Sequence, residues 1–184
     1  DIPFDAHEWT RYEHFTQRAG LPRIESAIYE ELYAVFGQKA PHFTQTERFI
    51  AVVVGAAAAY RLPSPAYRAR LLEQTWAATG LPLVFLGAKA EEQSAETLQK
   101  LLSSAPVQSL VGQLSLTEAV ACLRGAAGII GVETGLTHIA ATWGKPTLVL
   151  MGGGHWGRFF PYPPEFPHQP FLLYQLMPCY GCGW

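Results

Sequence analysis

The residues best suited to chemistry lie in a polar turn, residues 133–138 (Glu-Thr-Gly-Leu-Thr-His), which interrupts an apolar stretch. The apolar run before it is typical of a buried strand, and the residues after Gly135 are typical of a short helix. The Thr134 hydroxyl can donate a hydrogen bond, and Gly135 lets the backbone approach a ligand closely. Backbone N–H groups at a helix start favour an anion, above all at the carboxyl end of a parallel strand. The turn therefore predicts an anion-binding site.

A purely structural role explains the same residues. Thr134 would then be the helix N-cap, and His138 would be a packing histidine with satisfied hydrogen bonds. Glu133 would be a favourable charge near the positive end of the helix dipole. The spacing of these residues alone leaves both interpretations open.

A second turn with ligand-binding potential covers residues 55–61 (Gly-Ala-Ala-Ala-Ala-Tyr-Arg), directly after another apolar run. Its small residues allow close backbone approach, and Arg61 could neutralise a phosphate. The alternative is a solvated loop with Arg61 on the surface. No Walker or GxGxxG pattern is present, so an ATPase or a dinucleotide-binding protein lacks its fingerprint.

Two further segments end strands of the same expected sheet. Residues 87–92 (Gly-Ala-Lys-Ala-Glu-Glu) place Glu91 where ribose hydroxyls are often held, although Glu91 and Glu92 are also ordinary acids of a first helical turn. Residues 152–162 (GGGHWGRFFPY) form a glycine-rich, aromatic and cationic loop. Loops of this composition often close on ligands, and they also form plain turns.

The elements that must position these segments alternate between strand and helix patterns. The expected strands cover residues 49–55, 81–87, 107–110, 128–132, 146–151 and 171–174, and the expected helices cover residues 65–79, 91–103, 115–124 and 136–143. Ser115 and Glu118 form a capping-box pattern at one helix start. This alternation predicts an α/β fold, a Rossmann-like doubly wound parallel sheet with helices on both faces.

The order of the strands decides which turns meet. With right-handed crossovers, six strands most simply adopt the order 3-2-1-4-5-6. The crevice then falls between the first and fourth strands, so residues 55–61 face residues 133–138. Topology therefore predicts a ligand crevice at the turn that was selected from its local sequence.

The first residues of the chain lack the alternation of strand and helix patterns. Residues 5–18 predict an amphipathic helix with Trp9, Tyr12 and Phe15 on one stripe, and residues 24–36 predict a second helix. We therefore expect residues 1–46 to be a helical linker or a remnant of a preceding domain, and residues 47–184 to be the Rossmann-like domain. The fold would thus carry an N-terminal helical appendage.

Composition limits the partners and the compartment. The 184-residue chain is 49% hydrophobic with a formal net charge of −2, so nucleic acid is not an expected partner. No apolar stretch is long enough to span a bilayer, and no signal peptide opens the chain. Because it does not begin with Met, we expect it to be a piece of a longer protein. Three cysteines are too few for a disulfide scaffold, which favours a reducing cytosol, and Cys179 and Cys182 would need further ligands to hold a metal.

Several of these motifs together carry a family resemblance. Residues 132–153 (VETGLTHIAATWGKPTLVLMGG), followed by residues 158–162 (RFFPY), resemble the carboxyl half of the family 9 glycosyltransferases, the ADP-heptose:lipopolysaccharide heptosyltransferases and their relatives. The hallmark of that family is Asp-Thr-Gly-(Leu/Pro)-(Ser/Thr)-His-Leu-Ala-Ala. Residues 112–118 (GQLSLTE) are similar to the family's Gly-x-x-Ser-Leu-x-Glu. The resemblance covers the chain from about Phe49 to its end.

The resemblance implies one half of a GT-B enzyme, the half that binds the nucleotide-sugar donor. The turn at Thr134 would cradle the donor pyrophosphate, Glu133 would touch the sugar, and Glu91 would hold the ribose. The full set of implied donor-binding residues is Gly55, Ala57, Arg61, Glu91, Glu133, Thr134, Gly135, Leu136, Thr137 and His138. No metal or other cofactor is implied.

Two positions depart from the family pattern. The family usually has Asp where this chain has Glu133, whose side chain is one methylene longer. It also has Ser or Thr where this chain has Ala57, and Lys in a Lys-Arg-Trp-Pro pattern where residues 60–63 read Tyr-Arg-Leu-Pro. Either Arg61 replaces that lysine or the diphosphate is bound differently.

The resulting functional hypothesis is an inverting, metal-independent transfer of a sugar, such as heptose from ADP-heptose, to a lipopolysaccharide or other glycan acceptor. The general base would lie in an N-terminal domain of the same protein, so this chain alone would bind nucleotide without turnover. The expected location is the cytoplasm, at the inner face of a bacterial inner membrane. The alternative is a non-catalytic nucleotide- or glycan-binding module with a degenerate GT-B half, and a sugar epimerase fits the motif less well.

Overall fold

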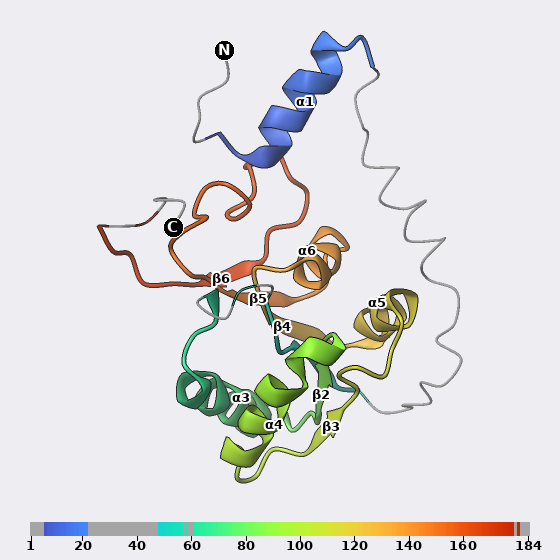
Figure 1. Cartoon of the computed structure of the whole chain (residues 1–184), viewed down its shortest axis with the longest axis vertical. Helices are drawn as coiled ribbons and strands as arrows, with labels where there is room; N and C mark the ends of the chain where they lie inside the picture. Colours follow the sequence, from blue (N-terminus) through green and yellow to red (C-terminus); the bar gives the residue numbers. More distant parts are fainter. Residues whose placement is uncertain (1–5, 22–47, 57, 59–60, 179, 181–184) are drawn as a thin grey trace.

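The computed structural model describes residues 6–21, 48–56, 58, 61–178 and 180, and its centre is one six-stranded sheet (Figure 1). The strands are hydrogen-bonded in the order β3-β2-β1-β4-β5-β6, and every neighbouring pair is parallel. Their bounds are β1 Ile50–Val53, β2 Leu83–Leu86, β3 Val107–Ser109, β4 Gly128–Val132, β5 Thr147–Leu150 and β6 Phe171–Leu173. The predicted strand order is therefore confirmed, and β1 and β4 are neighbours, as the predicted crevice requires.

Helices cover both faces of the sheet, as expected for parallel strands that are apolar throughout. The helices are α1 Glu8–Arg18, α3 Pro65–Thr79, α4 Glu92–Leu101, α5 Leu116–Gly125 and α6 Gly135–Thr142, with a 3-10 turn, η2, at Lys89–Glu91. Figure 1 shows α3 and α4 on one face, and α5 and α6 on the other.

Alternation along β1 connects the two layers of the core. Val52 and Val54 pack with residues of α3 and α4, whereas Ala51 and Val53 pack with residues of α5 and α6. Successive side chains of a strand point to opposite faces, so an unbroken apolar run is what a strand buried on both sides requires.

The helix boundaries follow from local capping chemistry. Ser115 accepts a hydrogen bond from the Glu118 N–H, and the Glu118 carboxylate accepts one from the Ser115 N–H, so the predicted capping box is confirmed. Ser64 caps α3 through the Tyr67 N–H, and Gly80 ends that helix with a φ of 67°. Gly is favoured at this position because the left-handed conformation strains other residues.

The N-terminal prediction is confirmed in part. The first helix begins at Glu8 rather than at residue 5, and it ends at Arg18 as predicted. Trp9 contacts Phe166, but Tyr12 and Phe15 are 64% and 67% exposed, so most of the predicted apolar stripe faces solvent. The predicted helix at residues 24–36 lies outside the described residues, as do Cys179 and Cys182.

A buried arginine fixes the carboxyl end of β1. Arg68, on α3, is 6% exposed and donates from Nη1 to the carbonyl oxygen of Val54 at 2.8 Å. Its Nη2 donates to Ser94 Oγ, on α4, at 3.3 Å. Burial lowers the pKa of Arg68. One side chain thus joins two helices to the strand end from which residues 55–61 depart.

No helix in the described part of the chain is both long enough and apolar enough to cross a membrane.

We predict that Glu73 on α3 stabilises the connection between α4 and β3. Its Oε1 accepts hydrogen bonds from the N–H groups of Ser103 at 2.5 Å and Ser104 at 2.9 Å, and these N–H groups, with burial opposing them, lower its pKa. Glu73→Gln should reduce the free energy of unfolding at pH 7, measured in urea, because a neutral amide oxygen is a weaker acceptor than a carboxylate. The expected loss is only about 1 kcal/mol, since solvent screens this carboxylate.

The same contact predicts a pH dependence. Because the folded-state pKa of Glu73 is below its ordinary value, the stabilisation is complete above pH 4.5 and is lost as the pH falls through the lowered pKa. The difference between wild type and Glu73→Gln should therefore shrink in acid. Glu96→Gln is the matched control, since Glu96 is exposed and its carboxylate lies 3.8 Å from Lys100 Nζ in a surface ion pair. An equal loss in both variants would contradict the prediction.

Candidate functional site

The polar turn between β4 and α6 leaves the start of its helix uncapped. Thr134 occupies the N-cap position, but its side chain makes no capping hydrogen bond. Its Oγ1 instead lies 3.1 Å from Oγ1 of Thr137, a fully buried residue. The first N–H groups of a helix have no partner within the helix. Thr134 therefore occupies the N-cap position that the structural interpretation gives it, but its side chain caps none of these N–H groups.

Gly135 has no structural requirement for being glycine. It is exposed, its φ is not in the left-handed region, and a Cβ built at this position would meet no atom within 4 Å. By contrast, a Cβ at Gly131 would collide with the buried Thr137 hydroxyl. The fold thus needs Gly131 for packing, whereas at Gly135 the missing side chain keeps the approach to the helix start open.

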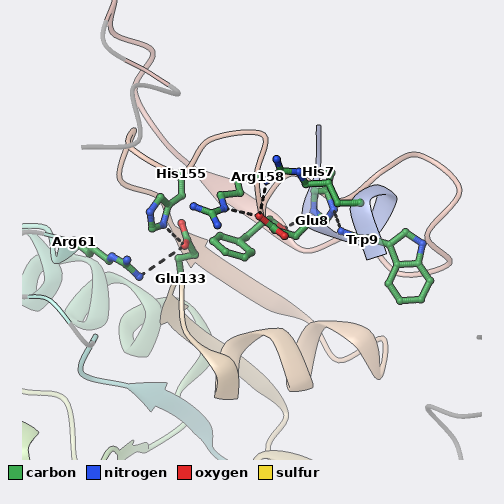
Figure 2. Close-up of polar contacts among 9 residues, drawn as sticks. His7, Glu8, Trp9, Arg61, Glu133, His155 and Arg158 are labelled. Carbon is green, nitrogen blue, oxygen red and sulfur yellow. Dashed lines mark hydrogen bonds and ion pairs between the residues drawn. The ribbon is translucent and has the colours of Figure 1, made fainter. Parts of the chain in front are cut away.

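Side chains from two other turns, those of Arg61 and His155, lie beside the Glu133 carboxylate (Figure 2). Its Oε1 lies 2.9 Å from Nδ1 of His155 and 4.0 Å from Nη1 of Arg61. The Glu133 and His155 side chains are each 10% exposed, and that of Arg61 is 26% exposed. The turns after β1, β4 and β5 therefore meet at one carboxylate. The sequence predicted that the turns after β1 and β4 would face each other.

Arg61 is incompletely satisfied in this arrangement. Its Nε is buried without a hydrogen-bond partner, and its contact with Glu133 is long for an ion pair. The guanidinium also carries N–H donors on Nη1 and Nη2, and Nη1 lies beside Glu133, which directly precedes the N-cap residue of α6. Gly55 is buried in the same turn, and Ala57 lies outside the described residues.

Glu91 reaches the crevice from the turn after β2. Its Oε2 accepts a hydrogen bond from the Ala88 N–H at 2.6 Å, and its carboxyl group packs on both Gly55 and Gly87. A Cβ at Gly55 would overlap that carboxyl group. Because residue 55 is glycine, the Glu91 carboxyl group can lie against the start of the turn formed by residues 55–61.

His138 does not face the turn. Its ring stacks on Phe160 at 4.1 Å between centroids, and its Nδ1 hydrogen-bonds the Tyr162 hydroxyl at 2.7 Å. Burial, with a smaller contribution from His7, lowers the pKa of His138 to about 4. The packing interpretation of this histidine therefore describes its position better than a direct donor contact.

The loop between β5 and β6 is held by the N-terminal helix. Arg158 Nε donates to Glu8 Oε1 at 2.7 Å, the Glu8 N–H donates to the Arg158 carbonyl oxygen, and His7 Nε2 lies 2.9 Å from the Phe159 carbonyl oxygen. Burial opposes ionisation of Glu8, but Arg158 and Arg11 outweigh it and lower its pKa. Sequence reasoning noted the loop's composition but did not assign roles to His155 or Arg158, because both partners lie far away in the chain.

Within the described residues, no group of three or more His, Cys, Asp or Glu side chains could hold a metal ion.

A family comparison agrees with this arrangement. The model of glycosyltransferase family 9 (heptosyltransferase) matches residues 13–169. The chain belongs to glycosyltransferase family 9. No curated protein matches it at a significant level.

Solved structures of family 9 and related proteins share the fold. Escherichia coli ADP-heptose lps heptosyltransferase II is 18% identical, with a TM-score of 0.61 over 84% of this chain and 45% of that protein. E. coli heptosyltransferase WaaC, solved with ADP-2-deoxy-2-fluoro heptose, is 21% identical, with a TM-score of 0.57 over 88% of this chain and 47% of that protein. The iron-containing dodecameric glycosyltransferase TibC of enterotoxigenic E. coli is 16% identical, with a TM-score of 0.51 over 73% of this chain and 33% of that protein. This family 9 chain spans less than half the length of each.

The position of His138 leads to a titration prediction. Its imidazole should stay neutral at pH 5 to 7 and titrate near pH 4 in the folded protein. The unfolded chain takes up that proton first, so the free energy of unfolding should fall as the pH drops from 6.5 toward 4. Side-chain NMR of 15N-histidine-labelled protein checks this, with His138→Gln assigning the resonance. A His138 midpoint at or above 6 would contradict the burial that the structure shows.

Proposed function

We propose that this chain is the donor-binding half of a family 9 glycosyltransferase that transfers a sugar from a nucleoside diphosphate to a saccharide acceptor. The observation that carries the proposal is the uncapped start of α6, directly after Glu133, together with the Arg61 guanidinium, whose Nη1 lies 4.0 Å from the Glu133 carboxylate. Both are donors without full partners, and both lie at the carboxyl edge of a parallel sheet, where such folds bind ligands. A diphosphate supplies the acceptors that both lack.

The proposed chemistry is a single displacement with inversion. The acceptor hydroxyl oxygen forms a bond to the anomeric carbon as the bond from that carbon to the diphosphate oxygen breaks, and a general base takes the hydroxyl proton. Negative charge grows on the leaving diphosphate. The N–H groups from Gly135 onward and Arg61 would stabilise that charge where it develops, without a metal ion.

The proposed donor is a nucleoside diphosphate sugar, with heptose as the first candidate sugar and ADP as the first candidate nucleotide. WaaC was solved with ADP-2-deoxy-2-fluoro heptose, which supports this choice by family kinship. Glu91 would accept hydrogen bonds from the ribose hydroxyls, since its carboxyl group lies against Gly55 at the crevice. Glu133 would contact the sugar that follows the diphosphate.

The rest of the reaction is assigned to parts of the protein beyond this chain. We propose that the general base and most acceptor contacts lie in an N-terminal domain of the same protein, and the chain's span of less than half of each solved neighbour supports this. We accordingly propose a boundary near residue 46, a lipopolysaccharide or other glycan acceptor, and action at the inner face of a bacterial inner membrane. This chain alone would bind the nucleotide and show no sugar transfer.

Gly135→Ala separates binding from folding. We predict that it leaves the free energy of unfolding equal or raises it by up to about 1 kcal/mol, because Ala is the better helix former and its Cβ meets no neighbour. The same methyl group stands where the diphosphate would approach. Calorimetry with ADP, UDP and GDP should show the affinity of the best-bound nucleotide falling about tenfold, which corresponds to about 1.4 kcal/mol.

Arg61→Ala should weaken the binding of that nucleotide to a similar degree. Arg70→Ala should not, because Arg70 is an exposed arginine on α3 that belongs to neither candidate turn. EDTA should leave the affinity unchanged. If folded wild-type protein binds none of the three nucleotides, the donor-binding proposal is wrong, and the degenerate, non-catalytic module becomes the better account.

A further inference from the structure

His155 and Glu133 form a carboxylate–histidine pair at the rim of the crevice. Glu133 directly follows β4, and His155 lies in the loop after β5, the neighbouring strand. The Glu133 Oε1 to His155 Nδ1 distance is 2.9 Å, and both side chains are only 10% exposed. The pair thus lies next to the start of α6.

The pairing decides how the histidine presents its other nitrogen. An ionised carboxylate only accepts hydrogen bonds, so Nδ1 must carry the proton that it donates to Glu133. In the neutral ring, Nε2 is then the nitrogen with the free lone pair. A carboxylate behind a histidine also fixes the orientation of the ring.

The ring is held on a second side as well. His155 meets Phe159 edge-on at 5.4 Å between centroids, and the Arg158 guanidinium lies over the Phe159 ring at 5.1 Å. Among the described residues His155 Nε2 has no hydrogen-bond partner, and it is not one of the fully buried polar atoms that lack one. An oriented acceptor therefore remains open to a ligand.

We propose that His155 is a specificity-determining residue that accepts, through Nε2, a hydrogen bond from a hydroxyl group of the donor sugar. The proposal rests on the proposed function, because the diphosphate at the start of α6 would place the attached sugar beside Glu133. The ligand class is a hexose or heptose linked to a nucleoside diphosphate.

The length of Glu133 supports this role. Its Oε1 is already shared by His155 and Arg61, so that oxygen is occupied before a sugar arrives. The additional methylene relative to aspartate extends the carboxylate toward the loop after β5. Glu133 thereby anchors His155, and the anchored ring adds a contact to the sugar that the carboxylate alone does not make.

The test compares each nucleotide with its sugar conjugate on the 184-residue chain. Calorimetry gives the dissociation constants for ADP, UDP and GDP and for ADP-heptose, ADP-glucose, UDP-glucose and GDP-mannose. The ratio of the nucleotide constant to the conjugate constant is the sugar increment. We expect an increment of about five- to tenfold for at least one pair in the wild type, as one good hydrogen bond supplies. If nucleotides bind but no conjugate binds more tightly, the role of His155 is refuted while donor-diphosphate binding stands.

Two amide variants separate the two ring nitrogens. His155→Asn places a donor near the position of Nδ1 and keeps the contact with Glu133, but it has nothing at the position of Nε2. His155→Gln places its amide near Nε2 and loses the contact with Glu133. We expect His155→Asn to lose the sugar increment with unchanged nucleotide affinity, and His155→Gln to keep most of it.

A merely structural histidine would give the reverse pattern, with Asn behaving as wild type and Gln failing, and that result would overturn the proposal. His155→Phe, which keeps the ring packing against Phe159, provides a second test of the sugar increment if the Asn variant folds poorly. It should also lose the increment and keep the nucleotide affinity. Retention of the increment in a folded Phe variant would likewise refute a contact through Nε2.

Discussion

The carboxylate of Glu133 lies between an imidazole from the loop after β5 and a guanidinium from the turn after β1, and the candidate site takes its shape from this arrangement. A carboxylate that is nearly buried must be paired, because desolvation of an unpaired charge is costly. Its two partners come from strands on either side of β4. The pairing of this one carboxylate thus brings together the turns after β1, β4 and β5 beside the start of α6. Arg61 keeps N–H groups that this contact does not use.

Most of the fold follows from the sequence by local rules. The strand order, the pairing of β1 with β4 and the capping box at Ser115 were all predicted, and the structure confirms them. These features depend on periodicity, on capping chemistry and on the handedness of crossovers, which are encoded within short windows. Element ends differ by a few residues because hydrogen bonding at a terminus frays, as at α1, which begins at Glu8.

The contacts that shape the site were less accessible to prediction. The sequence supplied Glu133, Arg61 and Glu91 as candidates, but not the pairing of Glu133 with His155 or the packing of Glu91 on Gly55. The role of Arg68 was missed for the same reason: its partners, Val54 and Ser94, lie on different elements. Such long-range contacts depend on the conformation that the loops adopt in the folded protein. Residue type and spacing in the sequence carry little information about that conformation.

The docking of α1 on the loop after β5 has a consequence for biosynthesis. Glu8 and Arg158 are separated by 150 residues, and His7 and Phe159 by 152. A ribosome releases α1 long before its partner loop exists, so this helix must wait until β1 to β5 have emerged. Contacts of such high sequence separation form late because closing the loop between them costs entropy first. Arg158 therefore meets Glu8 only after the loop that follows β5 has left the ribosome.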